Sequence, residues 1–69
     1  MYEVDARGLS CPEPVLLTAQ ALNSHKGETL RVLVDEPHTR QNVEKYAISQ
    51  GKKVSATKKD KEFELIIEA

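Results

Sequence analysis

Residues 2–14 read YEVDARGLSCPEP, and this stretch predicts a strand, a loop and the beginning of a helix. Residues 2–6 alternate apolar and polar side chains, which is the period of a half-buried strand, and residues 7–10 are typical of a loop. Proline is tolerated in the first turn of a helix, where backbone N–H groups have no intrahelical acceptor. Pro12 and Pro14 therefore predict that a helix begins at or just after Cys11.

The first helix is expected to bury one arc of its surface. Apolar residues at helical spacing form this arc, namely Val15, Leu16, Ala19 and Leu22. Thr18 flanks or opposes the arc, and Leu17 falls outside it, so we expect Leu17 to be exposed. Gly27 follows as a left-handed cap, because glycine adopts the conformation that ends many helices.

Residues 29–34 predict a strand in the middle of a sheet, since Leu33 is apolar on the face opposite Val32 and Val34. A turn at residues 35–37 leads into a second helix that runs to about Gln50 and closes at Gly51. This helix is expected to turn four residues toward the core, namely Val43, Tyr46, Ala47 and Gln50.

Residues 54–58 and 62–68 predict two antiparallel strands joined by a polar loop at residues 59–61. The element order is therefore β-α-β-α-β-β. Right-handed crossovers place both helices on the same face of a sheet whose first strands are parallel neighbours. We predict an α/β (α+β) two-layer sandwich, with a mixed four-stranded sheet and two helices on one face, as a single domain over residues 1–69.

The charge and length of the chain limit its partners and its setting. Ten basic and eleven acidic residues give a net charge of −1, which disfavours direct binding of nucleic acid. The lysine pairs at 52–53 and 58–59 are interpreted as solvated strand ends, with a docking patch as the alternative. No apolar run approaches the roughly 18 residues that cross a bilayer, so we expect no membrane association and a cytoplasmic location.

Cys11 is the one cysteine, so no internal disulfide can form, and its spacing from His25 and His38 is not typical of a zinc site. We therefore expect a free thiol and no metal. Both histidines lie far downstream and no second thiol exists, which argues against a Cys-His protease and against a thioredoxin-like cycle. A lone cysteine that only packs in the core remains an alternative.

A helix start favours the thiolate form of Cys11, because its free N–H groups and positive dipole end stabilise an anion. Arg7 is the nearest candidate cation, whereas the charge of Glu13 opposes the thiolate unless its side chain points to solvent. The two prolines on either side of Glu13 stiffen the corner that presents the thiol. We therefore predict that Cys11 is at least partly exposed and within reach of backbone N–H groups of the first helical turn. The net effect on the thiol is left open by the sequence.

Residues 5–15, DARGLSCPEPV, resemble the signature of the TusA/SirA sulfur-carrier family, in which a Cys-Pro-X-Pro motif opens the first helix. The likeness continues to residues 49–51 and is greatest to the amino-terminal TusA-like domain of YedF-type proteins, which are associated with selenium metabolism. The resemblance implies a β-α-β-α-β-β sandwich with strand order 1-2-4-3 and the fourth strand antiparallel to the others.

The resemblance also implies a sulfurtransferase-like carrier that needs no cofactor. Cys11 would receive sulfur as a persulfide from a cysteine desulfurase or another sulfurtransferase, and a monomer would relay it to an acceptor protein. The motif residues expected to support Cys11 are Arg7, Gly8, Pro12, Glu13 and Pro14. A non-catalytic interaction or regulatory module and a thiol redox sensor are the competing hypotheses.

Partners of such a carrier are expected to dock around the start of the first helix. The predicted contacts are Arg7, Leu9, Glu13 and the exposed Leu17.

Overall fold

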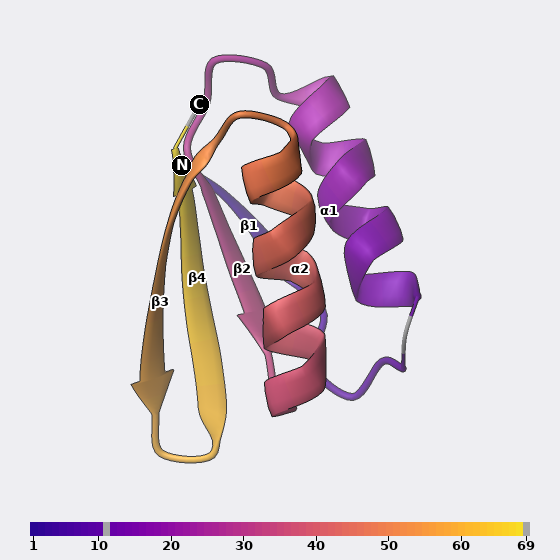
Figure 1. Cartoon of the computed structure of the whole chain (residues 1–69), viewed down its shortest axis with the longest axis vertical. Helices are drawn as coiled ribbons and strands as arrows, with labels where there is room; N and C mark the ends of the chain where they lie inside the picture. Colours follow the sequence, from indigo (N-terminus) through magenta and orange to yellow (C-terminus); the bar gives the residue numbers. More distant parts are fainter. Residues whose placement is uncertain (11, 69) are drawn as a thin grey trace.

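The computed structural model describes residues 1–10 and 12–68. Its elements follow the predicted order: β1 (Tyr2–Asp5), α1 (Glu13–Ser24), β2 (Leu30–Val34), α2 (Pro37–Ser49), β3 (Lys53–Lys59) and β4 (Glu62–Glu68). Both helices cover the same face of one sheet, and no element formed by the described residues covers the opposite face (Figure 1). The two-layer α+β sandwich is confirmed. No helix in these described ranges has both the length and the apolar character needed to span a membrane.

The four strands lie in the order β1-β2-β4-β3. β1 is parallel to β2, whereas β4 is antiparallel to both β2 and β3, as the family resemblance implied. β2 is therefore a central strand, as its apolar residues on both faces predicted. The carboxyl ends of β1 and β2 meet at one edge of the sheet, where both helices begin (Figure 1).

The core fills the space between the sheet and the two helices. Its sheet side is made of alternate residues, which share one face of a pleated strand: Val4, Leu30, Val32, Val34, Leu65 and Ile67. Val43 and Ala47 from α2 and Ala21 from α1 complete it. On the opposite face, Leu33 is also buried, with 8% of its surface exposed.

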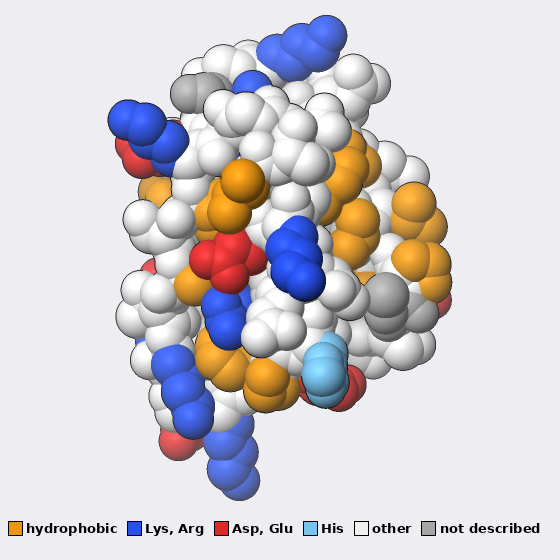
Figure 2. Space-filling view, viewed as in Figure 1, with side chains coloured by type: hydrophobic (Ala, Val, Ile, Leu, Met, Phe, Trp, Pro, Cys, Tyr) orange, Lys and Arg blue, Asp and Glu red, His pale blue; other side chains and the backbone are white. Residues whose placement is uncertain are grey.

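The predicted buried arc of α1 is wrong at Leu16, which is 54% exposed, and at Leu17, which packs against the core. The buried residues of this helix are Pro14, Thr18 and Ala21. Thr18 fits the core because its hydroxyl donates a 2.8 Å hydrogen bond to the Pro14 carbonyl, one turn earlier. The predicted buried face of α1 is rotated from the observed one because Thr18 was counted as a polar, outward-facing residue. Figure 2 shows apolar atoms at the surface of α1.

In α2, the predicted inward positions of Val43 and Ala47 are confirmed, and Tyr46 is half-buried. Gln50 is exposed, and it follows the last residue of the helix, Ser49. Ile48 is 58% exposed on the outer side of this helix. The final hairpin is tighter than predicted: β3 continues to Lys59, and Asp60 takes the left-handed conformation with φ of 57°.

Candidate functional site

Cys11 lies outside the described residues, and so do its predicted exposure and its predicted proximity to backbone N–H groups. Its neighbours along the chain are described. The Glu13 backbone N–H donates a 3.0 Å hydrogen bond to the Ser10 carbonyl, which links a described residue before Cys11 to one after it. The candidate site therefore comprises the loop before Cys11 and the helix after it.

The loop at residues 6–10 is fastened to the neighbouring strand β2 at two points. The Ala6 N–H donates to the Leu33 carbonyl at 2.8 Å, which continues the ladder between β1 and β2. The Gly8 N–H donates to Oδ2 of Asp35 at 3.0 Å. Gly8 has φ of 77°, a conformation that favours glycine, and Leu9 packs against the core. The loop thus has a defined path.

Asp35 is a site residue that the sequence analysis missed. It is 27 residues away from Gly8 along the chain, yet it directly follows β2 as Gly8 closely follows β1. Because parallel neighbours end at the same edge of a sheet, a polar residue after one strand can reach the loop after the other. That topological rule was the available signal.

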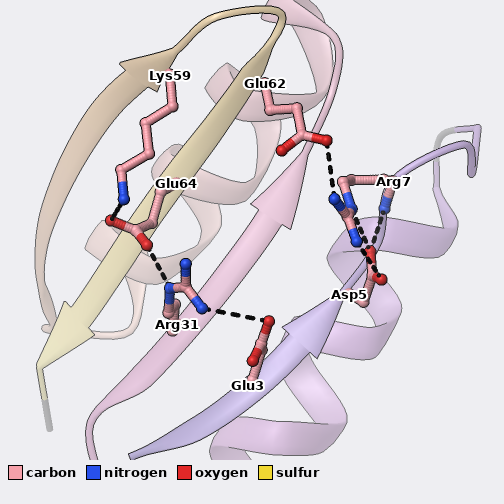
Figure 3. Close-up of polar contacts among 7 residues, drawn as sticks. All are labelled: Glu3, Asp5, Arg7, Arg31, Lys59, Glu62 and Glu64. Carbon is pink, nitrogen blue, oxygen red and sulfur yellow. Dashed lines mark hydrogen bonds and ion pairs between the residues drawn. The ribbon is translucent and has the colours of Figure 1, made fainter.

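Arg7 is held by carboxylates from two strands (Figure 3). Its Nε and NH2 groups each donate a 2.9 Å hydrogen bond to Asp5, and its NH1 group donates a 2.8 Å hydrogen bond to Glu62 of β4. The side-chain hydrogen bonds from Arg7, followed by its backbone N–H, lower the pKa of Asp5 to about 2. The same carboxylates raise the pKa of Arg7 above its usual value.

Through these contacts Arg7 ties the end of β1 to β4 across the uncovered sheet face. Its positive charge is already matched by two carboxylates, Asp5 and Glu62. The predicted role of Arg7 as the cation that favours the Cys11 thiolate stays a prediction.

At the start of α1, the three residues of the motif after Cys11 differ in their surroundings. Pro12 and Glu13 are exposed, whereas Pro14 is fully buried, so it anchors the first turn to the core. The exposure of Glu13 allows water to screen its charge, which weakens its opposition to a nearby anion. Pro12 and Pro14 carry no N–H, and that of Glu13 is taken by Ser10, so these groups are not available to an anion.

The apolar surface beside the motif also differs from the prediction. Leu9 and Leu17, expected to contact partners, both pack against the core. Leu16 is the exposed leucine instead, and its N–H bonds to the Pro12 carbonyl, so it lies one helical turn after Pro12. The structure therefore replaces Leu17 with Leu16 as the apolar candidate for partner contact.

A second group of charges spans the uncovered sheet face, and the sequence analysis missed it (Figure 3). Arg31 of β2 pairs with Glu64 of β4 and with Glu3 of β1, and Glu64 also pairs with Lys59 at 3.3 Å. The hydrogen bond from Arg31 is the main cause that lowers the pKa of Glu64. These side chains neutralise one another across all four strands.

The two histidines differ in position: His25 lies at the opposite end of α1 from the motif, whereas His38 lies where both helices begin. His25 is the C-cap of α1 and stacks on Tyr2, with a distance of 3.8 Å between ring centroids, while His38 is in the first turn of α2. Within residues 1–10 and 12–68, no cluster of three or more His, Asp or Glu side chains could hold a metal ion.

Comparison with known proteins is consistent with this geometry. The family model described as Sulfurtransferase TusA matches residues 2–69. A crystal structure of a SirA-like protein from Desulfitobacterium hafniense has 35% sequence identity and a TM-score of 0.93, and the match covers 100% of this chain and 97% of that one. TusA family proteins carry sulfur and act in relays with partner proteins. By its sequence and its fold, this chain belongs to the TusA/SirA sulfurtransferase family.

Proposed function

We propose that this protein accepts sulfur as a persulfide on Cys11 and relays it to an acceptor protein in a reducing, cytoplasmic setting. The observation that carries the proposal is that the single cysteine of the chain stands in the Cys-Pro-Glu-Pro motif of a sequence that matches the family over residues 2–69. With no second thiol in the chain, the sulfur on Cys11 cannot be lost to an internal disulfide.

The transfer balances without an added oxidant or reductant. The Cys11 thiolate attacks the terminal sulfur of a donor persulfide, so a new S–S bond forms on Cys11 while the donor's S–S bond breaks. The donor leaves as a thiolate. In the second step, an acceptor thiolate attacks the terminal sulfur on Cys11, and Cys11 leaves as a thiolate in turn. A cysteine desulfurase or another sulfurtransferase would supply the donor persulfide.

The loop before Cys11 supports this role because contacts with the sheet fix its path, while Pro12 and Glu13 on the other side of Cys11 are exposed. Asp35 and the Leu33 carbonyl hold residues 6–8, and Arg7 is tied to Asp5 and Glu62. A fixed loop presents a reactive group at low entropic cost when a partner docks.

Sulfur loading tests the proposal directly. The protein is incubated with a cysteine desulfurase and free cysteine, and intact-mass spectrometry should show the gain of one sulfur atom. Cys11→Ser should abolish the gain. A reductant should remove the added mass, which distinguishes a persulfide from a sulfinic acid of nearly the same mass. Unmodified protein after exposure to several active donors would favour an interaction module, and a reductant-resistant adduct would indicate oxidation.

Leu16 is proposed to contact the donor during loading. Leu16→Ala should slow donor-dependent loading several-fold, to about a tenth of the original rate if the side chain is a central contact. Ile48→Ala is the matched control, because Ile48 is equally exposed but lies at the far end of α2. Equal loading rates for the two variants would place the donor contact elsewhere.

A further inference from the structure

β3 forms one edge of the sheet, and its outer side has no partner strand in the described chain. It pairs only with β4 there, and all of its seven residues except Val54 are exposed. An edge strand presents unpaired N–H and C=O groups that can bind another extended chain. With seven residues, β3 is long enough to pair with an added strand.

The chain concentrates its lysines around this edge. Residues 52–61 contain five lysines and one aspartate, although the whole chain has a net charge of −1. Of these five, Lys59 alone has a carboxylate partner among the residues that the structure describes. Lys53, Lys58 and Lys61 are exposed, and Figure 2 shows blue side chains at the β3 side of the molecule and beyond the hairpin.

A shallow hollow lies beside this edge on the helix side of the sheet. Its lining comprises Arg40, Ala56, Lys58 and Phe63. The guanidinium carbon of Arg40 lies 5.6 Å from the centre of the Phe63 ring. Ala56 is exposed, so α2 does not cover this part of β3. The hollow thus has an apolar floor and a basic rim next to unpaired backbone.

We propose that the β3 edge binds an extended acidic segment of a partner protein, which adds to the sheet as a fifth strand. Its backbone would pair with β3, its carboxylates would face the lysines, and an apolar side chain would enter the hollow beside Phe63. This inference does not depend on the chemistry of Cys11.

The charges also decide against the other strand partners. Pairing β3 with β3 of a second copy would place lysines opposite lysines, and like charges opposite one another destabilise a sheet. The same lysines that prevent self-pairing therefore select an acidic strand. RNA would use the lysines but neither the free backbone groups nor the apolar hollow, so a protein segment fits more of the surface.

A synthetic nine-residue peptide of alternating valine and glutamate, with a fluorescent label, is the probe. Binding is measured by anisotropy, and the site is mapped by backbone amide NMR on the full chain. The expected shifts are confined to β3 and the hollow, and alternate β3 amides should exchange with solvent at least several-fold more slowly when the peptide is bound.

Two changes in the peptide test backbone pairing and charge separately. A central proline keeps the charge but removes an N–H donor, and it should weaken binding about tenfold. Replacing glutamate with lysine should abolish binding to the natural protein and restore it for the Lys53→Glu, Lys59→Glu double variant, because Lys53 and Lys59 share the sheet face on which the glutamates lie when the valines face the hollow. Lys26→Glu with Lys45→Glu is the matched control, since these exposed lysines lie off the edge and should leave the preference unchanged.

Circular dichroism first establishes that both double variants are folded, and the peptide exchange is then measured on folded protein. Equal binding of the proline peptide would overturn strand addition. Tighter binding of an oligouridylate at the same lysines would assign the patch to RNA, and shifts that map away from β3 would also overturn the proposal.

Discussion

Two connections, each from a strand to a helix, lie side by side at the end of the sheet where β1 and β2 finish. They differ in the contacts that fix their conformation. Residues 6–12 join β1 to α1, whereas residues 35 and 36 alone join β2 to α2. Both helices have proline within their first two positions, and neither N-cap side chain bonds to its own first turn. Asp35, in the short connection, instead accepts a hydrogen bond from Gly8 in the long one.

This difference shows that the long loop takes its shape from residues outside itself. The short connection is fixed by its length, because two residues leave little freedom between a strand and a helix. The long one is fixed from two strands, by Asp35 after β2 and by Glu62 of β4, which bonds Arg7. The position of the motif therefore depends on residues from β4 and from the end of β2 as well as on the loop itself.

Replacing Gly8 should have the largest effect on this arrangement. Gly8 and Gly51 have almost the same left-handed conformation, with φ of 77° and 78°, and an added Cβ has open space at both. Gly8→Ala and Gly51→Ala should each lower the free energy of unfolding by about 1–2 kcal/mol, measured by urea denaturation. Only Gly8→Ala should change the rate at which Cys11 reacts with an aromatic disulfide reagent. If Cys11 reacted at the same rate in both variants, the conformation of the loop would not control the reactivity of the Cys11 thiol.

Asp35→Ala should have the next largest effect, because it leaves the Gly8 N–H without its acceptor. We expect a loss of about 1 kcal/mol of stability and faster hydrogen exchange at the Gly8 amide. Glu36→Ala is the matched control: Glu36 is the next residue, is also exposed, and makes no side-chain bond to its helix. If the Gly8 amide exchanged at the same rate in both variants, the hydrogen bond from Gly8 to Asp35 would not be needed to fix the long loop. The two connections would then not differ in the way described above.

Much of the fold could be predicted because the strands and helices have different periods. Alternation in residues 2–6 and 29–34 identified β1 and β2, and the two prolines located the start of α1. The strand order came from the family resemblance, since hydrophobic patterns do not specify which strands pair. The buried face of α1 was misplaced because Thr18 is buried, with its hydroxyl donating a hydrogen bond to a backbone carbonyl.

The supports of the site were less predictable than its motif. Arg7 was singled out as a possible partner of a thiolate, yet its contacts are with Asp5 and with Glu62, which is 55 residues away. Asp35 was interpreted as part of a turn before a helix. The contacts of Gly8 with Asp35 and of Arg7 with Glu62 depend on the order of the strands, so hydrophobic patterns alone do not predict them.

Titration of Asp5 should give the smallest effect, and it tests how firmly Arg7 holds the long loop. The pKa of Asp5 is lowered from 3.8 to about 2 by its hydrogen bonds with Arg7. Because the folded value lies below the unfolded one, the contribution of this contact to stability is complete above about pH 5 and is lost as the pH falls through 2. At neutral pH it should be small, since both side chains are exposed and water screens their charges.

Carboxyl carbon chemical shifts measure this titration directly. Arg7→Lys should move the pKa of Asp5 back toward its ordinary value, because an ammonium group cannot reproduce the paired bonds of the guanidinium. Arg40→Lys is the matched control, as the carboxylate partner of Arg40 is Glu44 on the same helix and not Asp5. An Asp5 that already titrates near its ordinary value in the natural protein would mean that the Arg7 contact is open in solution. The long loop would then depend on Asp35 and on the ladder to β2 alone.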